Sequence, residues 1–520
     1  MNGLTALRCL LICAAGCGVS SCVHVAAAPD TEVQPDTHFQ ISIAEADRFE
    51  PQSPATLTAR LYYADFLLEP AAGSCAQRLD HARSLADSVD ANPVARVVFP
   101  AGWARVADLR YRIDRARAAC DPAAAHQTSA LRAAVRAARE AVRLYRDTFD
   151  YRSMAAMQYN MALALQALGD PSGAQAALGT AIEMDREFGL RDDAQDNYAL
   201  LLQWNHQRAG PEQMAQRMGD FPTRSTTLKF AWSPTNADLT LVIEHARAVD
   251  GALFLGTSTA SFERRVRAAD DGWVITTTRR TDPVDSGVWP QPADSERPPI
   301  TFRPTLLQFP TIDLTRSGDF KSVENLASFA ARMLADERSA IRAQAPAGDR
   351  ATTPATDAIR GAQHEFAPDV IAAEVAQTYG LETSMWIGAT LEQGVSYHLT
   401  IPLALPGVDF LIVDTRVDFL FSRELPCPNA PGARACVELI LHATPMEEPL
   451  RQALADMGLA PGYTMRYASS LAMRLIVDPL TLQPYLRDTR RYWYASVGKS
   501  LPSSTLMESD HSEFTLAYRE

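Results

Sequence analysis

Apolar residues recur at helical spacing from about Ala55 to Met218, and short breaks divide this stretch into separate helices. The clearest pair of helices runs from Tyr151 to Asp185. Between them stands Gly169-Asp170-Pro171, where glycine suits the end of one helix and proline the start of the next. The apolar positions of the pair are Met154, Met157, Met161, Ala162, Leu165, Leu168, Ala174, Leu178, Ala181 and Ile182. The first part of the chain is therefore predicted to be all-α.

After Gly219 the pattern changes to the alternation of apolar and polar residues that is typical of half-buried strands. From 413 to 421 the odd positions are mainly apolar, while Asp414, Arg416 and Asp418 occupy even positions. Such a strand has one buried face and one solvated face. The other strands and turns are expected at 262–268, 273–277, 312–314, 437–443, 471–478, 492–496 and 514–518. Proline-rich residues 284–304 are expected to form a long loop.

These patterns predict a multidomain chain, in which an N-terminal all-α array of helical repeats precedes an α+β region with antiparallel sheets. An alanine-, threonine- and proline-rich stretch separates two parts of the α+β region and is interpreted as a linker. The expected divisions are a signal peptide at 1–22, a flexible tether at 23–40, a helical domain at 41–219, an α+β domain at 220–342, the linker at 343–360 and a second α+β domain at 361–520.

The first 22 residues resemble the export signal of a bacterial lipoprotein. Arg8 precedes the apolar run Cys9–Val19, which is too short to span a bilayer and suits the core of a signal peptide. The run ends in Val19-Ser20-Ser21-Cys22, which is similar to the lipobox, whose cysteine receives the lipid. Ala14-Ala15-Gly16-Cys17 is an alternative. The resemblance implies an anchor on Cys22 and, because Val23 rather than aspartate follows it, the periplasmic face of the outer membrane.

The cysteine count favours cleavage before Cys22 over cleavage before Cys17. Cleavage there leaves four cysteines besides the lipidated one, and four can pair. Cys427 and Cys436 lie at the tip of a predicted hairpin. Cys75 and Cys120 lie at neighbouring ends of two predicted antiparallel helices. Both pairs are predicted to form disulfides, with free buried thiols as the alternative for the second pair.

The helix pair at Tyr151–Asp185 resembles a tetratricopeptide repeat. Small residues at the helix contacts and a glycine–polar turn carry the resemblance, through Ala162, Gly169, Asp170, Ala174, Leu178 and Ala181. Gln158 stands at the usual aromatic position and Arg186 at the usual terminal proline, so the repeat is divergent. The resemblance implies a groove made by first-helix side chains, here Gln158, Tyr159 and Met161. An irregular helical bundle is the alternative.

Composition and net charge exclude some classes of binding partner. The chain has 520 residues, a formal net charge of -13 and a pI of about 5.3. So acidic a surface repels phosphate backbones, which makes nucleic acid an unsuitable partner. After the first stretch no apolar run is long enough for a transmembrane helix, so the lipid is the expected membrane contact.

No catalytic or metal-binding constellation stands out. The ten histidines form no pair at metal-ligand spacing, and His398 and His442 are interpreted as structural residues of strands. Gly498-Lys499-Ser500 lacks the first glycine of a phosphate-binding loop. Ser496-Val497-Gly498-Lys499 has the spacing of penicillin-binding serine enzymes but lacks their companion motifs. No cofactor or metal is therefore expected, and the protein is interpreted as a non-enzyme.

The leading hypothesis is an envelope lipoprotein that binds a protein or peptide in a tetratricopeptide-like groove. The first alternative is a carrier that holds a lipid or other apolar ligand in the sheet region, where the segment from Val477-Asp478-Pro479 to Pro484 is similar to the sheets of periplasmic lipid carriers. The second alternative is an uncharacterised envelope enzyme.

The choice of Cys22 leads to a testable expectation. Cells that express the protein are expected to incorporate radiolabelled palmitate into it, and Cys22→Ala is expected to abolish the label. Cys17→Ala is the matched control and is expected to keep it. Undiminished labelling of the Cys22 variant would contradict the assignment.

Overall fold

A computed structural model describes most of the chain after residue 38. The described residues are 39–44, 54–69, 74–91, 100–121, 123–205, 224–232, 235–249, 252–281, 284–288, 308–344, 362–363, 366–430, 434–457, 464–498 and 504–518. The proposed lipidation cysteines Cys22 and Cys17 lie outside these ranges, as do residues 345–360 of the linker expected at 343–360. Its first two residues, 343 and 344, are instead the end of a helix. None of the described helices has the length and apolarity needed to cross a membrane.

The chain divides into two compact units, one largely helical and one built on a sheet. The helical unit comprises residues 1–223 together with 454–470 and 492–507, and the sheet unit comprises the remainder. Three long strands near the C-terminus thus contribute residues to both units. The predicted order of an all-α part followed by antiparallel sheets is confirmed.

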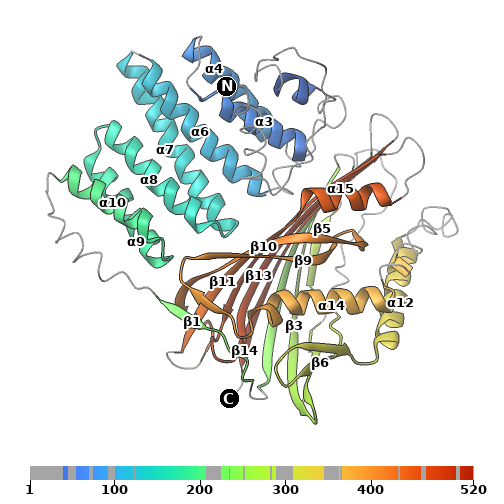
Figure 1. The fold of residues 1–520 in the computed structure, drawn as a ribbon. Helices are drawn as coiled ribbons and strands as arrows, with labels where there is room; N and C mark the ends of the chain where they lie inside the picture. Colours follow the sequence, from blue (N-terminus) through green and yellow to red (C-terminus); the bar gives the residue numbers. More distant parts are fainter. Residues whose placement is uncertain are drawn as a thin grey trace, which may run out of the picture. The chain divides into compact units, whose positions relative to one another are not determined.

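Helices of the first unit pack mainly against their neighbours in sequence, as Figure 1 shows. Small residues permit this close approach: Ala134, Ala138 and Ala141 of α7 are fully buried against adjacent helices. The helices are α3 (Pro54–Phe66), α4 (Cys75–Asp90), α6 (Pro100–Cys120), α7 (Ala124–Asp147), α8 (Tyr151–Ala167), α9 (Pro171–Glu187) and α10 (Arg191–Trp204).

The last two residues of the predicted tether belong to the folded part. The ring of Phe39 stacks on that of Tyr63 in α3, with 5.3 Å between ring centroids. The side chain of Gln40 donates a hydrogen bond of 3.1 Å to the Tyr63 hydroxyl. Phe39 and Gln40 are therefore not part of the tether expected at 23–40, and its other residues lie outside the described ranges.

A single antiparallel sheet of twelve strands forms the core of the second unit. Its order is β7-β6-β4-β3-β2-β14-β13-β12-β11-β10-β9, and β5 pairs with β3. The strands are β2 (Ala237–Val249), β3 (Ala252–Ala269), β4 (Gly272–Arg279), β5 (Val284–Val288), β6 (Ile312–Thr315), β7 (Phe320–Val323), β9 (Ser396–Leu405), β10 (Val408–Pro426), β11 (Ala435–Pro445), β12 (Thr464–Val477), β13 (Pro484–Gly498) and β14 (Ser504–Tyr518). A separate two-stranded sheet pairs β1 (Ser225–Thr227) with β8 (Thr390–Glu392).

The single sheet differs from the two separate α+β domains expected at 220–342 and 361–520. Strands from both segments belong to it, because β14, the last strand of the chain, lies between β2 and β13. The proline-rich stretch 284–304 was expected to be all loop, but its first residues form β5 against the edge of β3. Both the single sheet and β5 result from pairing between strands that are distant in sequence. The local pattern of apolar and polar residues does not predict which strands pair.

Charged side chains join β2 to β14 on both faces of the sheet, at what we call the β2–β14 seam. On one face, Nδ1 of His245 hydrogen-bonds Asp510. On the other face, Nδ1 of His511 lies 3.0 Å from Glu244 Oε2, and its Nε2 lies 2.9 Å from Oδ1 of Asp488 on β13. Glu244 and His245 are consecutive, so their side chains leave opposite faces of the strand.

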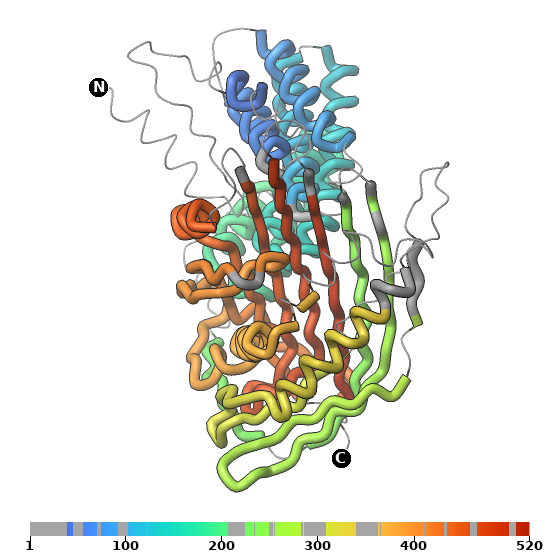
Figure 2. The backbone as a smooth tube through the Cα atoms, turned by 90° about the vertical axis from the view of Figure 1, so that its right-hand side faces the viewer, coloured from blue at the N-terminus to red at the C-terminus, as the bar shows by residue number. Residues whose placement is uncertain are grey.

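Helices α12 (Leu326–Gln344) and α14 (Pro368–Glu382) cross in front of the strands in Figure 2. Tyr379 of α14 packs with Trp232, Ile275 and Leu314. Helix α12 contacts α14 through Phe329 and Met333, which are buried in one cluster with Phe366 and Ile371. The sheet is thus backed by helices, which fits the α+β class expected for this region.

Strand β10 has the two faces that its sequence predicts. Val413, Val417 and Phe421 are buried, whereas the Arg416 guanidinium pairs with Asp418 on the exposed face. The strand pairs with β11 in the predicted hairpin, with Phe419 opposite Leu441.

Both predicted disulfides are present. Cys427–Cys436 closes the β10–β11 hairpin across 9 positions, and Cys75–Cys120 joins α4 to α6 across 45 positions. A crosslink restricts the unfolded chain more when the loop it closes is longer.

Removing the two disulfides separately is expected to destabilise the protein by different amounts. The double variant Cys75→Ser/Cys120→Ser is expected to lower the free energy of unfolding by about 4 kcal/mol, and Cys427→Ser/Cys436→Ser by roughly 2.7 kcal/mol, on the chain-entropy model. Chemical denaturation followed by circular dichroism measures both. Equal stability of the two variants and the native chain would contradict the pairing.

Candidate functional site

The turn between α8 and α9 has the geometry that its sequence predicts. Gly169 adopts a φ of +76°, a conformation that glycine reaches without steric penalty. The Asp170 carboxylate accepts a hydrogen bond of 2.9 Å from the backbone N–H of Gly173, which caps α9, and Pro171 is the first residue of that helix. The two helices are thereby fixed side by side.

The small residues assigned to helix contacts lie at those contacts. Ala162, Ala174 and Ala181 are fully buried, and Leu178 fills the space beside them. An alanine at a helix contact lets two backbones approach closely, while leucine supplies most of the buried apolar area. These positions agree with the repeat-like packing expected for the pair.

Two of the three predicted groove residues pack within the unit. Tyr159 and Met161 are half-buried, and both contact the cluster around Leu178. Gln158 is also half-buried, and its Oε1 has no hydrogen-bond partner among the described residues. Tyr198 and Trp204 of α10 join Tyr159 in the same cluster and keep part of their surface exposed. We call these three side chains the aromatic patch.

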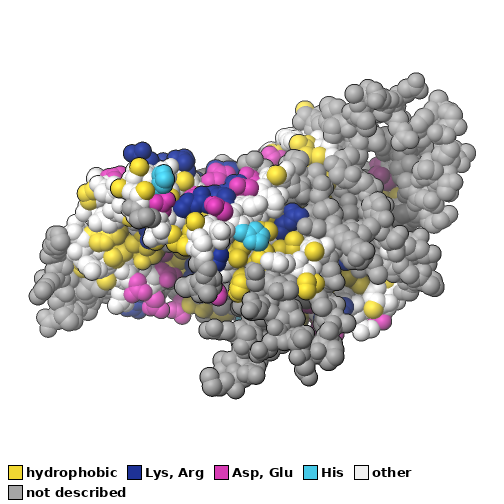
Figure 3. Space-filling model, turned by 90° about the horizontal axis from the view of Figure 1, so that it is seen from above, with side chains coloured by type: hydrophobic (Ala, Val, Ile, Leu, Met, Phe, Trp, Pro, Cys, Tyr) yellow, Lys and Arg dark blue, Asp and Glu magenta, His cyan; other side chains and the backbone are white. Residues whose placement is uncertain are grey.

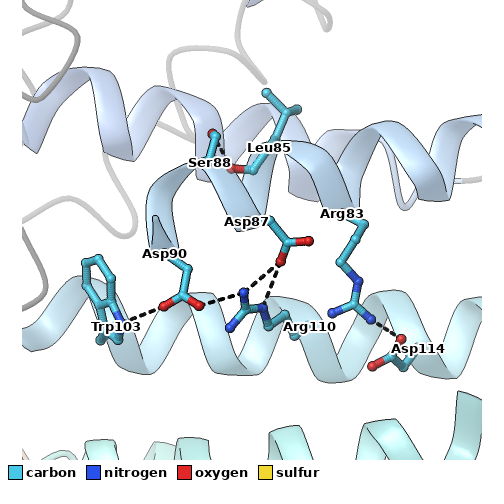
Figure 4. A network of polar contacts seen from close by, with 8 residues as sticks. All are labelled: Arg83, Leu85, Asp87, Ser88, Asp90, Trp103, Arg110 and Asp114. Atoms are coloured by element: carbon cyan, nitrogen blue, oxygen red, sulfur yellow. Dashed lines mark hydrogen bonds and ion pairs between the residues drawn. The ribbon is translucent and has the colours of Figure 1, made fainter. Parts of the chain in front are cut away.

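An ion-pair ladder aligns α4 with α6, as Figure 4 shows. The Arg110 guanidinium lies 2.7 Å from Asp87 and 2.7 Å from Asp90, and Arg83 pairs with the buried carboxylate of Asp114. The indole N–H of Trp103 donates a 3.0 Å hydrogen bond to Asp90. With Cys75–Cys120 near one end, this ladder fixes the register of the two antiparallel helices.

Asp185 is a buried acid that the sequence analysis did not single out. It accepts a 2.7 Å hydrogen bond from the side-chain amide of Asn197 and is 1% exposed. Burial raises its pKa to about 7, and the charge of Asp193 adds to that effect, whereas the hydrogen bond from Asn197 opposes it. Its burial could have been predicted from its spacing, because Leu178, Ala181 and Asp185 lie on one face of α9.

A row of partly buried polar side chains on β13 lies near α14 in the sheet unit. The Arg487 guanidinium of β13 pairs with Glu382 of α14 and lies over the ring of Phe514, 3.7 Å from its centroid. Arg491, four residues further along β13 on the same face, lies 3.2 Å from Asp510 of the seam. Burial lowers the pKa of Arg487, although the carboxylate of Glu382 opposes that effect. Sequence reasoning missed this row because alternating polar residues also suit a solvated strand face.

The two strand histidines lie beside one acid. His398 of β9 and His442 of β11 both stand opposite Asp418 of β10 in register. Arg416 already binds this carboxylate through two nitrogens. No group of three histidine, cysteine, aspartate or glutamate side chains that could hold a metal ion is found in the part of the chain that the structure describes.

The surface seen from above carries mixed charges. Acidic and basic side chains lie next to one another there, with apolar side chains between them, in the coloured part of Figure 3. A mixture of this kind is ordinary for a protein surface and indicates no particular class of ligand.

Comparison with known proteins gives little information about the function of this chain. No family model and no curated protein matches the chain. A solved structure concerned with lipid–protein interactions in lipovitellin is similar over 56% of this chain and 26% of that chain, at 7% identity and a TM-score of 0.27. This chain therefore spans about a quarter of that structure's length, and a similarity this low supports no argument about fold or function.

Asp185 is expected to make the stability of the helical unit depend on pH. Its pKa is higher in the folded chain than the ordinary value of 3.8, so the folded state binds the proton more tightly. The resulting stabilisation is complete below about pH 4, is lost as the pH rises through about 7, and amounts to roughly 4 kcal/mol. Asp185→Asn is expected to remove this dependence, which thermal melts between pH 4 and 8 measure.

Asp193→Asn is the control for Asp185→Asn. Asp193 lies near Asp185 but keeps 43% of its side chain exposed. This variant is expected to retain most of the pH dependence of the native chain, with a midpoint at somewhat lower pH, because the charge of Asp193 helps to raise the pKa of Asp185. Parallel curves for the native chain and Asp185→Asn would refute the role assigned to the buried acid.

Proposed function

We propose that the protein is an envelope lipoprotein whose helical unit binds a peptide or protein segment. Sequential packing of helices α3 to α10 carries the proposal, because an array in which each helix contacts mainly its neighbours presents one extended face to a partner. The divergent tetratricopeptide-like unit at α8–α9 belongs to this array. Anchoring through Cys22 at the periplasmic face of the outer membrane is part of the proposal.

The aromatic patch and Gln158 supply the chemistry for such binding. Tyrosine and tryptophan side chains are the residues that most often dominate the binding energy of protein interfaces. Tyr159, Tyr198 and Trp204 come from α8 and α10, which are the first helices of successive pairs. The Gln158 amide oxygen would accept a hydrogen bond from the backbone N–H of a bound segment once its side chain turns outward.

Paired cysteines support the export that this proposal requires. Cys75, Cys120, Cys427 and Cys436 are all bonded. Disulfides persist in oxidising compartments and are rare in the reducing cytosol. The bonds therefore support a location in the envelope.

The sheet unit favours a second candidate function, which is the carriage of an amphiphilic ligand. The observation that favours it is the partly buried row of Arg487 and Arg491 next to an apolar cluster on the same part of the sheet. A charged row beside an apolar surface matches a molecule with a charged head and a long apolar chain.

A photo-crosslinking experiment in intact envelopes tests the scaffold. Benzoylphenylalanine in place of Gln158 on α8 is expected to capture a discrete protein partner. The same group in place of Glu183, an exposed residue of α9, is the matched control and is expected to capture none. With the captured partner purified, Tyr198→Ala is expected to weaken binding by about 2 kcal/mol, roughly thirtyfold.

Two results would contradict the scaffold. One is capture of the same proteins at both positions, since a specific face would not be involved. The other is unchanged affinity of Tyr198→Ala for the captured partner, with circular dichroism confirming that the variant is folded.

A further inference from the structure

Three polar side chains of β13 lie in a row on one face of the sheet. Arg487, Thr489 and Arg491 occupy alternate positions of one strand, so their side chains leave it on the same side. The Cα atoms of the two arginines are about 13 Å apart at the usual rise of a strand. Thr489 stands midway between them.

Helix α14 supplies negative charge to this row. Glu382 pairs with Arg487, and the negative charge of Glu374 acts on Arg491. Both guanidinium groups therefore lie in the electrostatic field of carboxylates from one helix.

The row keeps unused hydrogen-bonding capacity. The Thr489 hydroxyl is buried and has no hydrogen-bond partner among the described residues, and the same holds for Nε of Arg487. A buried hydroxyl or guanidinium N–H is costly to leave unpaired, so these groups gain free energy from a ligand that accepts hydrogen bonds from them. A partner for a hydroxyl between two guanidinium groups is an anion with several oxygen acceptors.

An apolar core cluster adjoins the row. The Phe514 ring lies under Arg487, and Phe309 contacts both Phe514 and Phe262 edge to face. The buried members of this cluster are Ala237, Leu239, Leu241, Ile243, Ala260, Phe262, Phe514 and Leu516. Polar and apolar parts thus lie side by side, as they do in an amphiphile.

We propose that the row of Arg487, Thr489 and Arg491 binds the anionic head group, a carboxylate or a phosphate, of a long-chain amphiphile. The inference rests on the second candidate function and names its ligand. The head group takes the place that Glu382 occupies on Arg487, so the buried positive charge stays compensated throughout the exchange. Thr489 donates to the bound anion, and the chain lies along the cluster that contains Phe514.

Binding of a fluorescent fatty acid to the full chain tests the inference. The probes are cis-parinaric acid and its uncharged methyl ester. The native chain is expected to bind the acid at least tenfold more tightly than the ester. Thr489→Val, which keeps the shape of the side chain, is expected to bind the acid about tenfold more weakly and the ester unchanged.

Two further variants complete the set. Thr240→Val changes an exposed threonine of β2 and is expected to match the native chain. Glu382→Gln removes the carboxylate that competes for Arg487, so it is expected to bind the acid several-fold more tightly. Because this effect has the opposite sign, loss of folding does not imitate it.

The outcomes separate the two proposals. Equal binding of acid and ester by the native chain and every variant would overturn the head-group site and leave the carrier function standing. No binding of either probe would overturn both. Dodecyl phosphate is expected to displace the acid at micromolar concentration, and inorganic phosphate is not. Displacement by both at equal concentration would show that a free oxyanion, and not an amphiphile, is the ligand.

Discussion

Pairing of the last strand with β2 is the constraint on which the sheet depends. Residues 245 and 510 meet at this seam although 265 positions separate them. Without β14, the order of strands divides into one group that ends at β2 and another that begins at β13. Ion pairs on both faces of the seam fix its register, because a shift by one residue would bring like charges together and expose apolar side chains. The partly buried polar row borders this seam and depends on it.

The helical unit follows a different principle, since its contacts are mainly local. Each helix is placed by the turn before it and by small residues at the contact, as Asp170 and Ala162 illustrate for α8 and α9. Where the local signals are weaker, between α4 and α6, an ion-pair ladder and a disulfide set the register. The helical unit is thus held mainly by contacts between neighbours in sequence, whereas the sheet unit depends on contacts between distant segments.

This contrast explains what the sequence could and could not predict. The α8–α9 turn, the two faces of β10 and both disulfides have local signatures, and the structure confirms them. The single sheet has none, because nothing near 237–249 indicates that 504–518 will pair with it. Of the candidate site, Ala162, Gly169 and Leu178 lie where expected. In the sequence, Asp185 is recognisable only as an acidic residue at a position where the helical pattern predicts an apolar one. The ion pair of Arg487 depends on Glu382 of α14, so the sequence around Arg487 does not predict it.

The position of β14 in the chain has a consequence for biosynthesis. It follows every other strand of the sheet in sequence, so the ribosome must translate all of them before the gap between β2 and β13 can be filled. Until then, both of those strands expose unpaired backbone groups, through which incomplete chains can aggregate. A nonsense codon or a protease cut that removes β14 would therefore leave two long unpaired edges in place of one continuous sheet.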